Sequence, residues 1–262
     1  MNKVLEKIKA GEPTFGTWIQ IGHPAIAEIL AHFDFDWICV DMEHGVIDIE
    51  TMTSLFRAIE NGGSVPFVRL PSQDPAWIHR VLDAGAKGII APMVNSYKEA
   101  RSVVDHAKYP HLYEDFYIEG SRGFGFSRSN LYGIDFDSSI EKANDDIMVI
   151  IQVEHRFSIY HLPEILRVRG IDATFIGPYD LSGSFGKPGD FEYPSYIELL
   201  KEYHETSISR KVPRGCHIVH PNKQSISKAV EDGYTFIALG LDVTFFAKGI
   251  KDCMSDLKES LK

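Results

Sequence analysis

Short apolar runs alternate with longer amphipathic stretches along most of the chain. The short runs are rich in β-branched residues and apolar at nearly every position, which is typical of strands buried on both faces of a parallel sheet. We predict eight such strands, at residues 16–22, 36–42, 64–70, 88–94, 148–154, 172–177, 214–219 and 234–240.

Apolar positions three or four residues apart predict helices between these strands and after the last one. The helix after the third strand has Asp74 as its N-cap and Pro75 in its first turn, both favoured at helix starts. The predicted helices cover residues 26–32, 50–61, 75–84, 96–107, 158–168, 195–209, 222–232 and 243–261.

Eight strand–helix units predict an α/β protein with one domain over residues 1–262, a (β/α)8 barrel. An open, doubly wound sheet is the alternative, but it seldom has eight regular units, and no GxGxxG motif follows the first strand. Residues 108–145 interrupt the alternation between the fourth helix and the fifth strand. They contain no clear strand and include EGSRGFGFSRSN, so we predict an inserted loop or lid there. If this segment is a lid, Arg122 and Arg128 would attract anionic ligands. A solvated loop without a function in binding fits the sequence equally well.

Composition narrows the class of protein. The chain has 262 residues, 44% of them hydrophobic, as in soluble globular proteins. Its net charge of −10 disfavours nucleic acid and anionic membranes as partners. No apolar run reaches the ~20 residues of a membrane-spanning helix, and the N-terminal residues lack the apolar core of a signal peptide. Three widely spaced cysteines suit a reducing compartment. We therefore expect a cytoplasmic protein that acts on a small molecule.

Charged and polar side chains follow several predicted strands, at the end of the barrel where such enzymes carry their active sites. The second strand is followed by five residues, DMEHG, that cannot all pack in a core. Because the strand ends meet at one rim, we expect these side chains to form one site. The set is Asp41, Glu43, His44, Arg69, Gln152, Glu154, Asp180, His217 and Asp242.

The residue types in this set indicate a chemistry. Arg69 suits the two-pronged binding of a carboxylate, although an ion pair at the barrel rim is the structural alternative. Glu154 and Asp180 offer the oxygen ligands of a hard cation such as Mg²⁺ or Mn²⁺, although both could instead cap helices. His44 is a candidate catalytic group beside two carboxylates. His217 either lines the pocket or has a structural role.

Seven segments of the chain together resemble the class II pyruvate aldolases of the HpcH/HpaI family. The resemblance extends from about residue 4 to about residue 257. The segments are GTWIQIGHPAIAEIL, FDWICVDMEHG, VPFVRLP, VLDAGAKGIIAPMV, GSRGFGFSRSN, IIQVEH and FIGPYDLSGSFGKPG.

This resemblance implies a lyase that reversibly cleaves a 4-hydroxy-2-oxo acid to pyruvate and an aldehyde. It implies a divalent metal ion (Mg²⁺, Mn²⁺ or Co²⁺) as cofactor. It also implies a homo-oligomer, a hexamer built as a trimer of dimers whose chains exchange their last helix.

The resemblance also implies roles for individual residues. His44 corresponds to the catalytic base, Arg69 to the arginine that binds pyruvate, and Glu154 and Asp180 to the metal ligands. Further roles follow for four other residues: the oxo acid contacts Gln152 and the backbone of Tyr179, and Asp41 and Glu43 hold metal-bound water.

An aspartate that raises the basicity of the histidine corresponds to Asp83. Asp83 ends the third predicted helix, and helices of this barrel return to the face away from His44. If Asp83 has the role that the resemblance implies, it must therefore serve the active site of a neighbouring subunit. Geometry alone favours the alternative that Asp83 satisfies only local backbone groups.

Two departures from the family concern the aldehyde half of the substrate. Several relatives have an apolar residue in place of His217, and residues 108–145 are longer than in the simplest relatives. One alternative is a synthase that condenses an enolised oxo acid or thioester with another oxo acid, as in citrate synthesis. Another is a barrel that binds an oxo acid without turnover, which His44 and Asp83 disfavour. A Schiff-base aldolase is also disfavoured, because Lys87 and Lys211 precede their strands.

Overall fold

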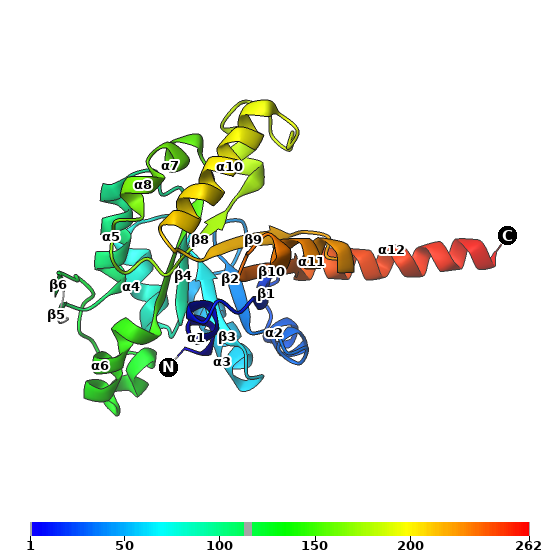
Figure 1. Cartoon of the computed structure of the whole chain (residues 1–262). Helices are drawn as coiled ribbons and strands as arrows, with labels where there is room; N and C mark the ends of the chain where they lie inside the picture. The colour runs from blue at the N-terminus through cyan, green and yellow to red at the C-terminus, as the bar shows by residue number, and fades with distance from the viewer. Residues whose placement is uncertain (1, 113–116, 262) are drawn as a thin grey trace.

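The computed structural model describes residues 2–112 and 117–261, and in it eight parallel strands form a closed barrel (Figure 1). The strands follow one another around the barrel in the order β1-β10-β9-β8-β7-β4-β3-β2. The (β/α)8 prediction is confirmed, and the open sheet is excluded. The strands are β1 (Thr14–Ile19), β2 (Trp37–Asp41), β3 (Val65–Arg69), β4 (Gly88–Ala91), β7 (Met148–Val153), β8 (Ala173–Ile176), β9 (Arg214–Ile218) and β10 (Phe236–Leu241).

Aromatic rings fill the inside of the barrel. Successive side chains of a strand point to opposite faces, so alternate residues of each strand point inward. The rings of Trp37 and Phe236 stack with centroids 4.0 Å apart, and Phe67 packs against both. Gly16 makes room for them, because a Cβ there would lie 2.0 Å from the Trp37 ring. The interior is therefore packed solid below the strand ends that carry the candidate site.

A helix that the sequence analysis did not predict, α1 (Lys3–Lys9), closes the opposite end of the barrel. Its buried residues Val4, Leu5 and Ile8 belong to the same apolar cluster as the barrel interior. The Asn2 side chain donates hydrogen bonds to the carbonyls of Lys87 and Asp146, which precede β4 and β7. The carboxyl ends of the strands are thus the open end.

Outer helices cover the barrel and largely match the predicted ones. The single helix predicted over residues 158–168 is wrong, because the chain forms two short helices that meet at His161. Pro163, in the first turn of the second, has no N–H to continue the first helix. The helices are α2 (Pro24–Ala31), α3 (Ile49–Asn61), α4 (Pro75–Asp83), α5 (Tyr97–Ala107), α7 (Arg156–Tyr160), α8 (Leu162–Ile165), α9 (Pro178–Gly183), α10 (Pro194–Ser209), α11 (Lys223–Glu231) and α12 (Asp242–Ser260).

The insertion between α5 and β7 is more structured than a loop. It contains an antiparallel pair of two-residue strands, β5 (His111–Leu112) and β6 (Tyr117–Ile118), a 3-10 helix η1 (Arg128–Gly133) and the helix α6 (Phe136–Asp146). The prediction that no strand lies in residues 108–145 is therefore wrong; residues 113–116 lie outside the described chain. Hydrogen bonds hold α6: Lys108 Nζ donates to the carbonyls of Asn144 and Ile147, and Tyr109 N donates to Asn144 Oδ1.

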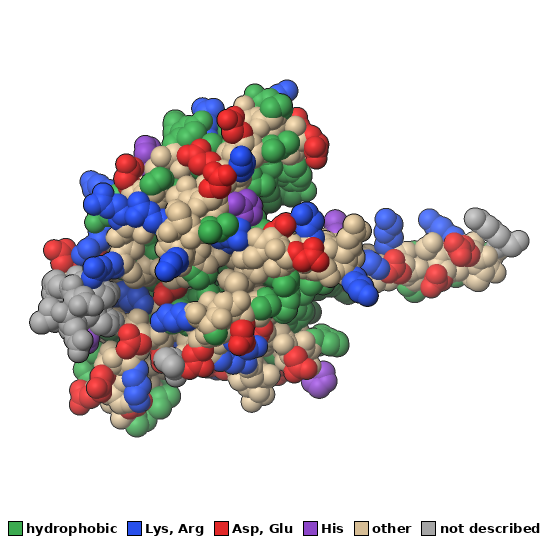
Figure 2. Space-filling model, in the orientation of Figure 1, with side chains coloured by type: hydrophobic (Ala, Val, Ile, Leu, Met, Phe, Trp, Pro, Cys, Tyr) green, Lys and Arg blue, Asp and Glu red, His purple; other side chains and the backbone are tan. Residues whose placement is uncertain are grey.

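The last helix, α12, projects away from the barrel (Figure 1). Most of it is exposed, including Phe246, Ile250, Met254 and Leu257. Apolar side chains are visible beside its base in Figure 2. An apolar stripe on a projecting helix is the arrangement expected of a helix that packs on another subunit. No described helix has the length and apolar character needed to cross a membrane.

Candidate active site

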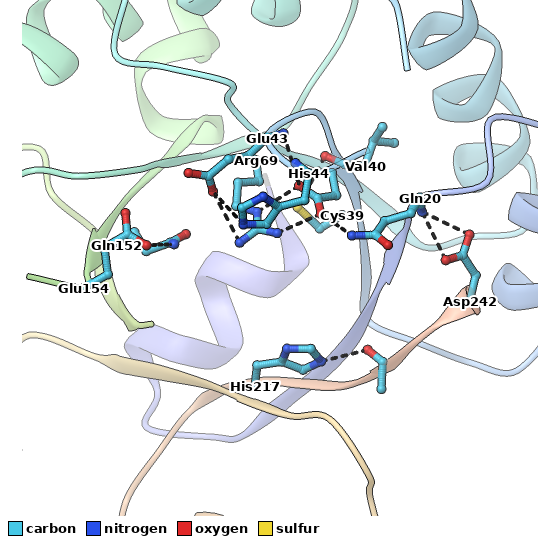
Figure 3. A network of polar contacts seen from close by, with 12 residues as sticks. Gln20, Cys39, Val40, Glu43, His44, Arg69, Gln152, Glu154, His217 and Asp242 are labelled. Carbon is cyan, nitrogen blue, oxygen red and sulfur yellow. Dashed lines mark hydrogen bonds and ion pairs between the residues drawn. The ribbon is translucent and has the colours of Figure 1, made fainter. Parts of the chain in front are cut away.

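Polar side chains at the ends of β2, β3 and β7 point into one space at the open end of the barrel (Figure 3). Asp41, Arg69 and Gln152 are inward-facing residues of these strands, and Glu154 comes directly after β7. β2 pairs with β3 in parallel, and Asp41 and Arg69 are opposite each other in this pairing. The structure thus brings together residues up to 113 positions apart in the chain, as the strand-end argument predicted.

Asp41 fixes the position of Arg69. Arg69 Nε donates to Asp41 Oδ1 at 2.9 Å and Nη2 to Oδ2 at 2.7 Å, while Gln20 Nε2 donates to Oδ2 at 2.8 Å. Asp41 is fully buried. Burial alone would raise its pKa, but the hydrogen bonds and charge of Arg69 outweigh burial and lower it. Asp41 is therefore an anion whose oxygens are committed to Arg69 and Gln20.

The Arg69 guanidinium is held on two further sides. Its Cζ atom lies 4.7 Å from the centroid of the Trp18 ring, and Nη1 lies 3.3 Å from Glu43 Oε2. A cation on an aromatic face between two carboxylates has little freedom to reorient. Arg69 is therefore fixed before any substrate arrives, as a group that stabilises developing negative charge must be.

Glu154 is a buried carboxyl group, and the groups around it do not offset the cost of ionising it. Its Oε1 accepts a hydrogen bond from Met93 N at 2.6 Å, and its Oε2 from Gln152. Burial, together with the charges of Glu43 and Asp180, raises the pKa of Glu154 to about 7. The Met93 backbone has a φ of 53°, a left-handed conformation that Gln73 supports by donating to the Met93 carbonyl.

The carboxylates around Glu154 fit a divalent cation. Gln152 Oε1 is buried without a hydrogen-bond partner, which is costly for a polar group unless another ligand satisfies it. Glu43 Oε2 is also buried and accepts no hydrogen bond, but it forms an ion pair with Arg69 Nη1 3.3 Å away. Burial also raises the pKa of Glu43. Asp180 is exposed in the first turn of α9. Among the described residues no three His, Cys, Asp or Glu side chains converge on one point, so water or substrate would complete the coordination.

His44 lies at the rim beside these acids. Its side chain is 57% exposed, and its Nε2 lies 4.0 Å from Glu43 Oε2. Asp41 Oδ1 accepts hydrogen bonds from the backbone N–H groups of Glu43 and His44, which fixes the loop. The loop requires glycine at Gly45, where a Cβ would lie 2.2 Å from the Asp41 carbonyl oxygen. The imidazole is thus anchored but accessible to a substrate.

Asp83 lies away from this group within the chain. It is the last residue of α4, and its Oδ1 accepts a hydrogen bond of 3.1 Å from Arg122 Nη2. Arg122 is buried and lies over the Tyr109 ring. The second insertion arginine, Arg128, pairs with Glu60. Both arginines therefore bind other parts of the chain, which does not support the predicted role as free anion-attracting groups.

The remaining candidates lie on other sides of the open end. His217 faces the barrel interior from β9, and its Nε2 lies 3.1 Å from the carbonyl oxygen of Gly240. Tyr179 is exposed on α9, where its ring packs against Phe191. The sequence analysis missed Gln20 and Met93. Gln20 directly follows β1 and obeys the strand-end rule, whereas Met93 acts through its backbone and leaves no sequence signal.

Comparison with known proteins identifies the family of this chain. A family model described as HpcH/HpaI aldolase/citrate lyase matches residues 14–249. The chain belongs to the HpcH/HpaI aldolase/citrate lyase family. The resemblance inferred from the sequence motifs is thereby confirmed.

Three relatives show what this HpcH/HpaI chain is similar to. A 4-hydroxy-2-oxo-heptane-1,7-dioate aldolase of Klebsiella pneumoniae subsp. pneumoniae is 34% identical over 250 residues, covering 95% of this chain and 91% of the relative. A family member of solved structure from Burkholderia cenocepacia J2315 has a TM-score of 0.91 at 28% identity, covering 98% of this chain and 100% of that one. The citrate synthase SbnG has a TM-score of 0.84 at 25% identity, covering 98% and 97%.

Proposed function

We propose that this protein is a metal-dependent lyase that cleaves a 4-hydroxy-2-oxo acid to pyruvate and an aldehyde, and that also runs the reverse addition. The observation that carries the proposal is that Arg69, fixed by Asp41, and the buried carboxyl group of Glu154 face the same space at the barrel mouth (Figure 3). The relative that is 34% identical is named a 4-hydroxy-2-oxo-heptane-1,7-dioate aldolase.

The substrate-binding roles that we propose are those that the family resemblance implies. Glu154 and Asp180 would hold a divalent cation of the Mg²⁺, Mn²⁺ or Co²⁺ type. When bound, that ion would act as a Lewis acid for the oxo acid. Arg69 places its fixed positive charge where the enolate oxygen develops. Gln152 and the backbone of Tyr179 bind the oxo acid. Glu43 and Asp41 have different tasks, because Glu43 faces the proposed cation whereas Asp41 holds Arg69.

His44 is the proton acceptor in cleavage. It removes the proton of the 4-hydroxyl group, and the O–H electron pair becomes the second bond of the aldehyde carbonyl. The C3–C4 bond breaks, and its electron pair forms the enolate of pyruvate beside Arg69. A proton added at C3 then gives pyruvate. In the addition reaction the same groups act in reverse order.

Metal removal tests the proposal. Dialysis of the protein against EDTA should abolish the release of pyruvate from 4-hydroxy-2-oxo acids while the fold persists, because the two metal carboxylates lie at the rim of a packed barrel. Activity is measured by coupling pyruvate to lactate dehydrogenase, and folding by circular dichroism. Added Mg²⁺, Mn²⁺ or Co²⁺ should restore turnover. Full turnover after verified metal removal would contradict the metal-dependent mechanism, and a protein that never releases pyruvate from these acids would not be an aldolase.

We further propose that the site is shared between subunits of a hexamer that exchanges α12. Asp83 lies at the end of α4, with Arg122 beside it, and Phe124 and Phe126 of the same loop are 59% and 77% exposed. At the rim of the site, Val46 beside His44 is fully exposed. Exposed apolar residues thus lie near both Asp83 and His44. They support a contact in which Asp83 of one subunit lies against His44 of the next.

Mixed oligomers test this contact. His44→Ala and Asp83→Ala chains should each be nearly inactive alone, and subunit exchange between them should restore part of the activity, since some sites then carry both wild-type residues. The measurement is pyruvate release before and after mixing, with exchange confirmed by native mass spectrometry. A mixture of two His44→Ala preparations is the control. Confirmed exchange without any gain in activity would rule out the shared site.

A synthase is the second candidate, supported by the structural similarity to the citrate synthase SbnG. In that reaction the enolate would add to a second oxo acid instead of an aldehyde. Mass spectrometry of products formed from pyruvate with aldehydes and with oxaloacetate separates the two functions.

A further inference from the structure

The proposed oxo-acid site occupies only one side of the barrel mouth. Arg69 ends β3, and Glu154 and Asp180 follow β7 and β8, whereas β9, β10 and β1 form the other side. His217 points from β9 into the space that Arg69 and Gln152 also face (Figure 3). A substrate that extends from Arg69 across the mouth therefore meets His217.

An aromatic floor connects the two sides. The Trp18 ring lies under the Arg69 guanidinium at 4.7 Å, and its centroid is 5.9 Å from that of His217. Phe175 packs edge-on against Trp18 at 5.6 Å. A short carbon chain lying on this floor would have one end at Arg69 and the other at the His217 ring.

The hydrogen bond of His217 determines its tautomer. Its Nε2 lies 3.1 Å from the Gly240 carbonyl oxygen, which can only accept, so Nε2 carries the hydrogen. Burial, with the charges of Arg69 and His220, lowers the pKa of His217 to about 4, against the smaller opposing effects of Gly240 and Asp41. The ring is thus neutral in neutral solution, and Nδ1 presents a lone pair.

That lone pair is available to a ligand. Within residues 2–112 and 117–261 no hydrogen bond to His217 Nδ1 is formed, and Nδ1 is not among the buried polar atoms that lack a partner. Nδ1 therefore has no hydrogen-bond partner in the described chain and keeps some contact with solvent. A neutral nitrogen acceptor attracts a hydroxyl group, which donates, and not a carboxylate, which only accepts. Asp41 and Glu43 on the same mouth also disfavour a second anion.

We propose that His217 selects the aldehyde half of the substrate through a hydrogen bond from an aldehyde hydroxyl group to Nδ1. The preferred aldehydes then carry a hydroxyl group next to the carbonyl. A distal carboxylate, as in the heptanedioate named for the relative, is disfavoured. This inference rests on the proposed aldolase function.

Glycolaldehyde and propanal test the inference, because they have the same shape and differ only by a hydroxyl group in place of a methyl group. Aldol addition to pyruvate is measured as kcat/KM for each aldehyde, with succinic semialdehyde as the carboxylate-bearing aldehyde. The kcat/KM of the wild-type protein should be roughly 10-fold or more higher for glycolaldehyde than for propanal or succinic semialdehyde. This ratio is what one specific hydrogen bond contributes. In His217→Leu the ratio between glycolaldehyde and propanal should fall to about 1. His220→Leu, the same substitution at the exposed histidine beyond β9, should keep the wild-type ratio.

Three outcomes overturn the inference in distinguishable ways. If the wild-type protein adds pyruvate to propanal or succinic semialdehyde as readily as to glycolaldehyde, it does not select hydroxyaldehydes. This result does not depend on whether His217→Leu folds. An unchanged ratio in a folded His217→Leu protein assigns the selection to another residue. The absence of addition to any aldehyde overturns the aldolase function itself, and the selection with it.

Discussion

Arg69→Lys is expected to lower the turnover of aldol cleavage by ~100-fold or more, while the affinity for pyruvate changes much less. Arginine donates to both oxygens of Asp41 and still contacts Glu43, whereas a lysine ammonium cannot make both contacts at once. The charge would remain, but it would no longer be held where the enolate oxygen forms. Steady-state kinetics and pyruvate binding by calorimetry separate the two effects.

Arg69→Ala would be harder to interpret, because it would leave Asp41 buried and charged without its partner. Such a loss typically destabilises a protein by about 3–5 kcal/mol. The double variant Arg69→Ala/Asp41→Asn removes both charges and is the matched control for stability, measured by urea unfolding. If Arg69→Lys kept the wild-type kcat and only raised KM, Arg69 would be a uniform binding group and not a group that acts on the transition state.

Glu154→Gln should abolish turnover and yet stabilise the metal-free protein at high pH. The folded protein raises the pKa of Glu154 from 4.5 to about 7, so between these values it binds more protons than the unfolded chain. The free energy of unfolding without metal must therefore fall as the pH rises from 5 to 8, by roughly 3 kcal/mol for this group. A glutamine side chain does not titrate. In Glu154→Gln the free energy of unfolding should therefore lack the part of the decrease between pH 5 and pH 8 that Glu154 causes.

Urea unfolding in EDTA at pH 5 and pH 8 measures this difference. Glu28→Gln, which removes an exposed carboxylate on α2, is the control and should retain the wild-type pH dependence. An equal fall in the wild-type and Glu154→Gln proteins would mean that Glu154 is not the buried acid responsible. Added Mg²⁺ or Mn²⁺ should stabilise the wild-type protein at pH 8 and leave Glu154→Gln unaffected, because binding to the folded state alone raises its stability.

The barrel could be predicted because its strands are buried on both faces and so have continuous apolar runs. The site could be predicted because the ends of parallel strands meet, which brought Asp41 into contact with Arg69 and placed Arg69 and Glu154 around one space. α6 was not predicted, because its apolar residues are few: Phe136, Ile140 and Ala143 share one face, and the one buried side chain along it is the polar Asn144. α1 is only seven residues long, too short for a clear periodicity.

Individual roles were harder to predict than positions. The sequence places Asp41 at a strand end, but only the structure shows that both its oxygens accept hydrogen bonds from Arg69 and that Oδ2 also accepts one from Gln20. The support of Glu154 by the Met93 backbone depends on a positive φ that a methionine rarely adopts, and no pattern of side chains indicates it. The pairing of Asp83 with Arg122 joins α4 to the insertion, where periodicity gives no guidance.

The projecting α12 makes the last stage of folding depend on the number of chains present. β10 runs directly into this helix, so the barrel can close within one chain while the apolar stripe of α12 still faces water. Under the proposed exchange, that stripe is covered in a step that needs two chains and whose rate rises with protein concentration. The amount of enzyme in a compartment would then control the fraction of it that is assembled, independently of any ligand.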